Sequence, residues 1–122
     1  MKSALEILLE SPNVDNRAEK KLKIKRIVLN GEPLVCTIRS LGYARVADIK
    51  KMDSDQVPLH MILAGVTDPD FKNKELNEKY GAGTPADLVK KLFLPGEIDD
   101  ICREIEKLSG YRQNMVEEVK KK

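Results

Sequence analysis

Few side chains in this sequence are of the types that perform chemistry, and they are not grouped. The only histidine, His60, lies in an apolar helical segment, where a partly buried helix residue is a simpler interpretation than a general base. The two cysteines, Cys36 and Cys102, lie in separate apolar runs, which favours buried free thiols over a disulfide or a metal site. The sequence therefore predicts no catalytic residues.

Phosphate and metal sites are equally poorly supported. The stretch Gly81-Ala82-Gly83 is followed neither by a further glycine nor by the Lys-Ser/Thr pair that a phosphate-binding loop requires. Asp68, Asp70 and Asp99-Asp100 occupy positions typical of helix caps and surface charges, without the spacing of a calcium loop. We therefore expect no cofactor and no metal ion, and we expect that the protein is not an enzyme.

The basic run Lys20–Arg26 is the strongest candidate for nucleic-acid binding. On a strand its lysines share a face that could follow a phosphate backbone. No aromatic residue is interleaved for base stacking, and the 22 basic and 20 acidic residues of the chain nearly cancel. A solvated strand face, or lysines that protect a sheet edge from aggregation, is favoured. A small nucleic-acid-binding or regulatory domain remains the alternative.

Length and hydropathy place the chain among small globular proteins. Its 122 residues predict one domain over 1–111 and a charged tail over 112–122. No apolar run approaches the ~20 residues of a membrane span, and no signal-peptide pattern is present. Free cysteines are typical of a reducing compartment, so we expect a cytoplasmic protein. Because the charges nearly cancel and no membrane span is present, we expect neither nucleic-acid nor membrane partners.

The first elements have clear local signals. Ser3-Ala4-Leu5-Glu6 is a capping box that opens a short helix with a leucine stripe and ends at Pro12. We expect this helix to pack on the domain, with a detachable docking element as the alternative. A polar linker over 13–20 follows. Two β-rich runs, Leu22–Leu29 and Leu34–Ile38, then flank Asn30-Gly31, which predicts a hairpin. Because Pro33 cannot donate to a ladder, the second strand should be an edge or begin after it.

The rest of the chain predicts short helices that are joined by tight turns. We expect helices over Ser40–Met52, from Ser54 or Asp55 onward, over Asn73–Tyr80, and from Thr84 to Leu94. The clearest is the last, in which Ile98, Ile101, Cys102, Ile105 and Leu108 form one apolar stripe before Gly110. Met115, Val116 and Val119 predict a frayed helix or an unstructured tail. The fold class is therefore α+β and predominantly helical: a short N-terminal helix, a β-hairpin and a bundle of about four to five short helices.

Five ordered segments of this helical region resemble a known family. They are Leu63–Phe71, Glu75–Gly81, Thr84–Asp87, Leu94–Ile98 and Leu108–Tyr111. In order and spacing they are similar to phage tail assembly chaperones of the XkdN-like kind, which are found in tailed phages and prophages of Gram-positive bacteria.

The resemblance implies a function in virion morphogenesis. Members of this family coat the tape measure protein and keep its long hydrophobic helices soluble until tail tube subunits replace them. The expected partners are the tape measure protein and the tail tube protein, with weak self-association, in the host cytoplasm. A structural tail or neck adaptor is the alternative within the same setting.

Bulky apolar residues near helix ends are candidates for partner binding. Such a chaperone requires apolar grooves that hold helices loosely, so that the client can be displaced. The candidates are Phe71, Leu92, Phe93, Leu94 and Tyr111. For each of them, burial in the core is the alternative.

Overall fold

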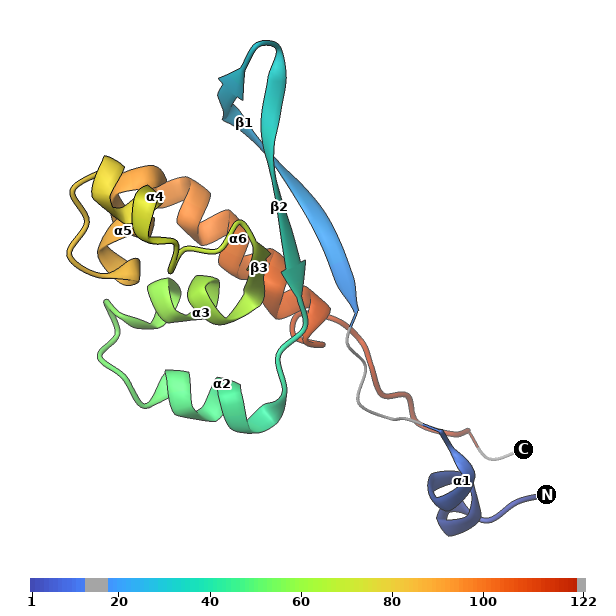
Figure 1. The fold of residues 1–122 in the computed structure, drawn as a ribbon. Helices are drawn as coiled ribbons and strands as arrows, with labels where there is room; N and C mark the ends of the chain where they lie inside the picture. Colours follow the sequence, from blue (N-terminus) through green and yellow to red (C-terminus); the bar gives the residue numbers. More distant parts are fainter. Residues whose placement is uncertain (13–17, 121–122) are drawn as a thin grey trace.

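The computed structural model describes residues 1–12 and 18–120 and confirms the α+β architecture (Figure 1). Within the described residues a hairpin is followed by five helices and one further short strand. Parts of the predicted linker (13–17) and tail (121–122) lie outside the described residues. The elements are α1 (Ala4–Glu10), β1 (Glu19–Leu29), β2 (Glu32–Arg39), α2 (Tyr43–Lys50), α3 (Val57–Gly65), β3 (Val66–Asp68), α4 (Lys74–Lys79), α5 (Pro85–Leu92) and α6 (Pro95–Leu108).

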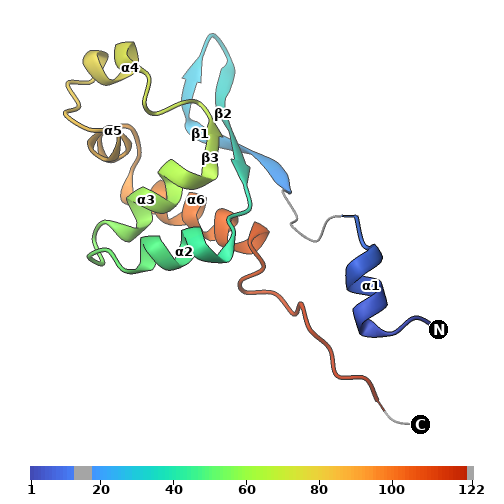
Figure 2. The same ribbon diagram turned by 60° about the horizontal axis from the view of Figure 1, so that its bottom comes forward.

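The N-terminal helix α1 forms as predicted, but it does not pack. Its capping box is complete, since the Glu6 N–H donates to Ser3 Oγ at 3.2 Å. Leu5, Leu8 and Leu9 are nevertheless 66%, 64% and 74% exposed. Figures 1 and 2 both show α1 standing apart from the other elements. The expected packing on the domain is therefore wrong, because the hairpin and the later helices close the core without it.

The predicted hairpin is confirmed, and β2 is the central strand of the sheet that β3 extends. Asn30 and Gly31 have φ of 53° and 80°, the positive values of a tight hairpin turn. Pro33 lies inside β2 opposite Val28, so the expectation that the strand begins after it is wrong. The sheet order is β1-β2-β3, but β3 reaches only as far as Thr37 and Ile38. Pro33 therefore lies beyond β3, where its missing N–H removes no bond to that strand.

The short strand β3 was not predicted. Its three residues, Val66–Asp68, fall in a stretch that the sequence indicates is a turn.

The tail shows no helix over 114–120, and Met115, Val116 and Val119 are exposed. Of the two alternatives for the tail, the described residues therefore show the unstructured one.

Helix α6 ends with the expected backbone motif. The Tyr111 N–H donates to the Glu106 carbonyl at 2.9 Å, and the Gly110 N–H donates to that of Lys107 at 3.1 Å. Gly110 has φ of 95°, which a side chain would disfavour. These two bonds define a Schellman motif, so the predicted glycine stop is confirmed.

The predicted caps of α4 and α5 are also confirmed. Asn73 accepts from the Leu76 N–H at 2.9 Å, and Thr84 accepts from the Asp87 N–H at 3.0 Å. Helix α3 begins at Val57, later than predicted, because 54–56 form a turn. Helix α2 begins at Tyr43 and so is shorter than predicted, and its Val46 and Ile49 are buried.

Helix α6 lies between the sheet and α3. One of its sides packs on the sheet and another on α3, which in turn contacts α2 and α5 (Figure 2). Ile105 is fully buried, and a Cβ on Gly65 of α3 would lie 2.5 Å from its Cδ1. A side chain at position 65 would therefore push the two helices apart. No helix of the described residues is both long and apolar enough to span a membrane.

Candidate partner-binding site

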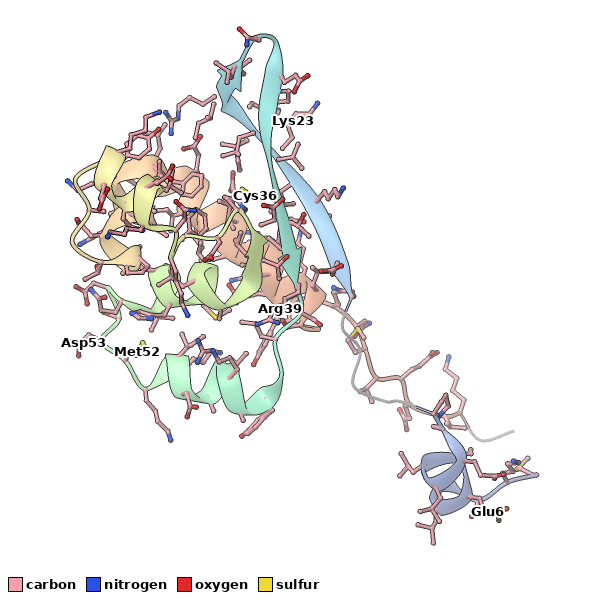
Figure 3. All side chains as sticks on the ribbon, viewed as in Figure 1. Glu6, Lys23, Cys36, Arg39, Met52 and Asp53 are labelled. Atoms are coloured by element: carbon pink, nitrogen blue, oxygen red, sulfur yellow. The ribbon has the colours of Figure 1, made fainter. Side chains whose placement is uncertain are left out.

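The residues that could do chemistry are dispersed and mostly buried. His60 lies half-buried in α3. Cys36 on β2 (Figure 3) and Cys102 on α6 are buried free thiols, which confirms their prediction. Burial raises the pKa of Cys36 to about 11 and that of Cys102 to about 12, so both thiols stay protonated at neutral pH. In the part of the chain that the structure describes, no three His, Cys, Asp or Glu side chains are grouped to hold a metal ion.

Three neighbouring hollows, of about 450, 140 and 220 Å³, lie along α6 on the side of α2, α3 and α5. The first and second hollows share Pro58 and Asp99, and the second and third share Val46 and Tyr111. These shared walls make the hollows one feature, which we call the α6 trough.

The α6 trough has apolar walls and a charged rim. Its walls include Leu59, Ile98, Val57 and Met61. Its rim carries charges of both signs, which include Asp55, Lys90, Lys50 and Glu106. It follows α6, whose 14 residues correspond to about 21 Å at 1.5 Å per residue.

Two of the five predicted partner-binding residues line the α6 trough, at opposite ends. Phe93 lines the first hollow but is only 4% exposed, because its ring packs edge-on against Phe71 at 6.0 Å. Tyr111 lines the second and third hollows and is 38% exposed. The Lys50 ammonium lies 4.8 Å from the centre of its ring. Tyr111 is therefore the more accessible of the two.

The other three predicted residues lie elsewhere. Phe71 is buried behind Phe93 in the core. Leu92 is half-buried and packs against the core cluster. Leu94 is 52% exposed, but it lines a different hollow on the opposite side of α6. The structure therefore does not bring the five residues together in one surface.

The hollow that Leu94 lines is separate from the α6 trough. It has a volume of about 380 Å³ and lies between β1 and α6. Five consecutive strand residues, Leu22–Arg26, line it, which means that it follows the free edge of β1. Its helix wall is formed by Glu97, Asp100, Ile101 and Glu104, the i, i+3, i+4 and i+7 positions of one helix face. We call this feature the β1–α6 groove.

Ion pairs bridge the two walls of the β1–α6 groove. The Arg26 guanidinium donates to Glu97 at 2.9 and 3.1 Å and to the Leu92 carbonyl at 2.7 Å. Lys20 donates to Glu104 at 2.5 Å. These hydrogen bonds hold the pKa of the Glu97 and Glu104 carboxyls below its usual range. Two cations of the basic run are thus engaged within the molecule.

Most trough-lining residues were missed from the sequence. Ile98 was predicted as part of the α6 stripe, and its place at the edge of that stripe was the signal that it could be partly open. Pro58, Val46 and Met61 fall within expected helices, and the sequence gives no sign of a surface role for them. Their contribution depends on how α2 and α3 lie against α6, which no local pattern encodes.

The fold is that of a small α+β protein with hollows on opposite sides of α6. Residues 44–121 match the family model of the phage XkdN-like tail assembly chaperone protein. Because this match covers more than half of the chain, the protein belongs to the XkdN-like tail assembly chaperone family. No curated protein matches the chain.

A solved structure shows the same fold. The crystal structure of the protein yqbn superposes with a TM-score of 0.73 at 20% sequence identity. The alignment covers 91% of this chain and 99% of that chain. At this identity the likeness shows the fold alone.

Proposed function

We propose that the protein binds the tape measure protein of a tailed phage or prophage and keeps it soluble during assembly of the tail tube. It acts by stoichiometric, non-catalytic binding in the host cytoplasm, and tail tube subunits later replace it. The observation that carries this proposal is the α6 trough in a chain of the tail assembly chaperone family.

The trough suits a client that must be held and then released. Its apolar walls can bury one face of an amphipathic helix, as in helix-in-groove recognition. Its three hollows are shallow and its charges lie at the rim, so that few directional bonds fix one client sequence. Many weak contacts along a long client give solubility without preventing displacement.

The basic strand gives less support to nucleic-acid binding. Lys20 and Arg26 form ion pairs with carboxylates of α6. Lys21, Lys23 and Lys25 remain, and the last two lie beside the acidic helix wall of the groove. A phosphate backbone that approached β1 would meet these carboxylates as well.

Co-expression with the tape measure protein of the same phage or prophage tests the proposal. We expect the chain to raise the soluble fraction of that client, as measured by quantitative gel analysis after centrifugation. The client should also co-purify with the chain. A client that is equally insoluble with and without the chain would overturn the proposal.

Matched variants separate the trough from other surfaces. Ile98→Asp and Tyr111→Asp place a charge in the trough and should abolish most of the solubilisation. Leu94→Asp places the same charge at an exposed position on the other side of α6 and should leave it intact. Circular dichroism confirms that each variant is folded. Equal client solubility with all three variants would show that the trough is not the client site.

A further inference from the structure

The connection between α5 and α6 carries one wall of the proposed client site. Only Phe93 and Leu94 separate the two helices, and both have extended backbones. Phe93 lines the first hollow of the α6 trough, together with Lys90 from the end of α5 and Ile98 from the start of α6. The path of this two-residue connection therefore determines the shape of the wall.

Arg26 reaches the connection from a bulge in β1. Ile24 and Val28 lie opposite neighbouring residues of β2, so that the three residues between them have no partner in the register. Arg26 is the middle residue of the three. A bulge bends its strand and redirects side chains. The Arg26 guanidinium thus leaves the ladder and extends to the end of α5.

Arg26 and Glu97 together hold the two peptide groups that flank Phe93. The Arg26 Nη2 donates at 2.7 Å to the Leu92 carbonyl, which belongs to the peptide group before Phe93. The Arg26 Nε and Nη2 donate to the Glu97 carboxylate at 3.1 and 2.9 Å. The same carboxylate accepts at 2.7 Å from the Leu94 N–H, which belongs to the peptide group after Phe93.

These bonds satisfy backbone groups that the two helices leave unpaired. The Leu92 carbonyl lies in the last turn of α5, and the Leu94 N–H lies at the N-cap of α6, where intrahelical partners are missing. A guanidinium presents its donors in a rigid planar fork, so that it fixes positions as well as charge. The Phe93 ring is buried against Phe71, so that a shift of its backbone also disturbs the packing behind the wall.

The other ion pair between β1 and α6 has no such link to the connection. Lys20 donates to Glu104, which also accepts from Lys107 at 3.3 Å within α6. Glu104 lies seven positions, about two helical turns, beyond Glu97. Because this pair joins the same strand to the same helix, it is a matched reference for the pair of Arg26 and Glu97.

We propose that Arg26 and Glu97 form a positioning clamp, which fixes the α5–α6 connection and, through Phe93, the shape of the first hollow of the α6 trough. The effect of this clamp on client binding rests on the proposed function, whereas its effect on the connection does not. None of the described hairpin residues lines the trough. The hairpin therefore contributes to the client site from the opposite side of α6.

NMR of the free protein tests the clamp without a client. Arg26→Gln removes the fork, and Lys20→Gln breaks only the other ion pair. In Arg26→Gln we expect several-fold faster hydrogen exchange of the Leu94 amide and a shifted Ile98 methyl signal. The Val46 methyl signals, which report on the second and third hollows, should stay unchanged. Lys20→Gln should leave all of these signals as in the wild type.

Two results of this experiment would overturn the proposal. One is an Arg26→Gln variant in which the Leu94 exchange and the Ile98 signal equal those of the wild type. The other is an equal change in Arg26→Gln and Lys20→Gln, which would show a general loss of stability instead of a local effect on the connection.

Fluorescence anisotropy with a labelled synthetic amphipathic segment of the tape measure protein tests the effect on the client site. Arg26→Gln should raise the Kd several-fold, and Lys20→Gln should leave it close to the wild-type value. Arg26→Lys keeps the charge but loses the fork, so it should bind the segment as weakly as Arg26→Gln. Wild-type affinity in Arg26→Lys would overturn the clamp, because the charge alone would then suffice.

The two experiments separate the clamp from the proposed function. Wild-type protein that does not bind the segment at a saturating concentration would contradict the proposed function, and the Leu94 exchange still decides whether the clamp fixes the connection. An equal loss of client affinity in Arg26→Gln and Lys20→Gln would overturn the positioning role.

Discussion

The two sides of α6 differ in how they are built. On the trough side, α3 packs on α6, the walls of the hollows are mainly apolar, and charges lie at the rim. On the groove side, Arg26–Glu97 and Lys20–Glu104 bridge β1 to α6. The family match begins at residue 44. It therefore includes all the residues that line the two hollows sharing Pro58 and Asp99, but it does not include β1.

The two sides of α6 therefore differ in chemical character. An apolar trough without directional bonds suits a client whose sequence changes along its length. The groove is bordered by charges that are fixed in ion pairs within the molecule. The proposed client site is therefore the first surface and not the second.

The largest effect should come from the residue that supports both sides. Ile105 is fully buried in α6, so Ile105→Ala should lower the free energy of unfolding by about 2–5 kcal/mol. Urea denaturation measures this. Lys107→Ala, on the exposed face of the same helix, is the control and should change stability by less than about 0.5 kcal/mol. Equal effects of the two variants would show that α6 is not the centre of the core.

The contact between α3 and α6 gives the next effect. Gly65→Ala should cost about 1–3 kcal/mol, because the new methyl group would lie 2.5 Å from Ile105 Cδ1. Ile105→Val removes that carbon, so the double variant should be less destabilised than the sum of the single ones. A double-mutant cycle by urea denaturation measures the coupling. Strict additivity would contradict the close approach of these helices.

The ion pairs of the groove side predict a dependence on pH. Arg26 and Lys20 lower the pKa of Glu97 and Glu104, so these carboxyls stabilise the fold above their unfolded pKa of about 4.3. This contribution is lost as the pH falls through the lower folded values. Thermal unfolding between pH 7 and pH 3 should therefore show a smaller acid-induced loss for Glu97→Gln/Glu104→Gln than for the wild type.

Salt provides the control for this pH dependence. In about 1 M salt the Debye length falls to about 3 Å, so the difference between the wild type and the double variant should shrink. An acid-induced loss that is identical in both proteins at low salt would show that the two bridges contribute nothing.

The smallest effect belongs to the trough side. Lys50 lies over the ring of Tyr111, and Lys50→Ala should lower stability by about 0.5–1 kcal/mol, as for an exposed cation–π contact. Lys50→Arg keeps the cation and should be close to the wild type in the same thermal unfolding experiment. Loss of stability in both variants would point to the lysine stem instead of its charge.

The features that the sequence predicts are those with local causes. Asn73, Thr84 and Gly110 determine caps and stops through bonds to residues at most a few positions away. Asn30-Gly31 determines the hairpin turn in the same manner. The apolar stripe of α6 is also a local periodicity. These elements could be located without any knowledge of the tertiary structure.

The features that the sequence does not predict depend on contacts between distant elements. Lys20 and Glu104 are 84 positions apart, and their pairing exists only once β1 lies on α6. Phe71 and Phe93 look like surface candidates at helix ends, yet they pack on each other in the core. The strand β3 is too short for a periodic pattern and forms only because β2 lies beside it.

Methyl NMR of the chain with a synthetic amphipathic segment of the tape measure protein tests the central claim most directly. Met61 and Ile98 report on the trough, and Leu22 and Ile24 report on the groove. We predict saturable shifts of the Met61 and Ile98 methyl signals, with those of Leu22 and Ile24 unchanged. Shifts confined to Leu22 and Ile24, or no shift at any of these methyl groups at a saturating client concentration, would contradict the assignment of the trough as the client site.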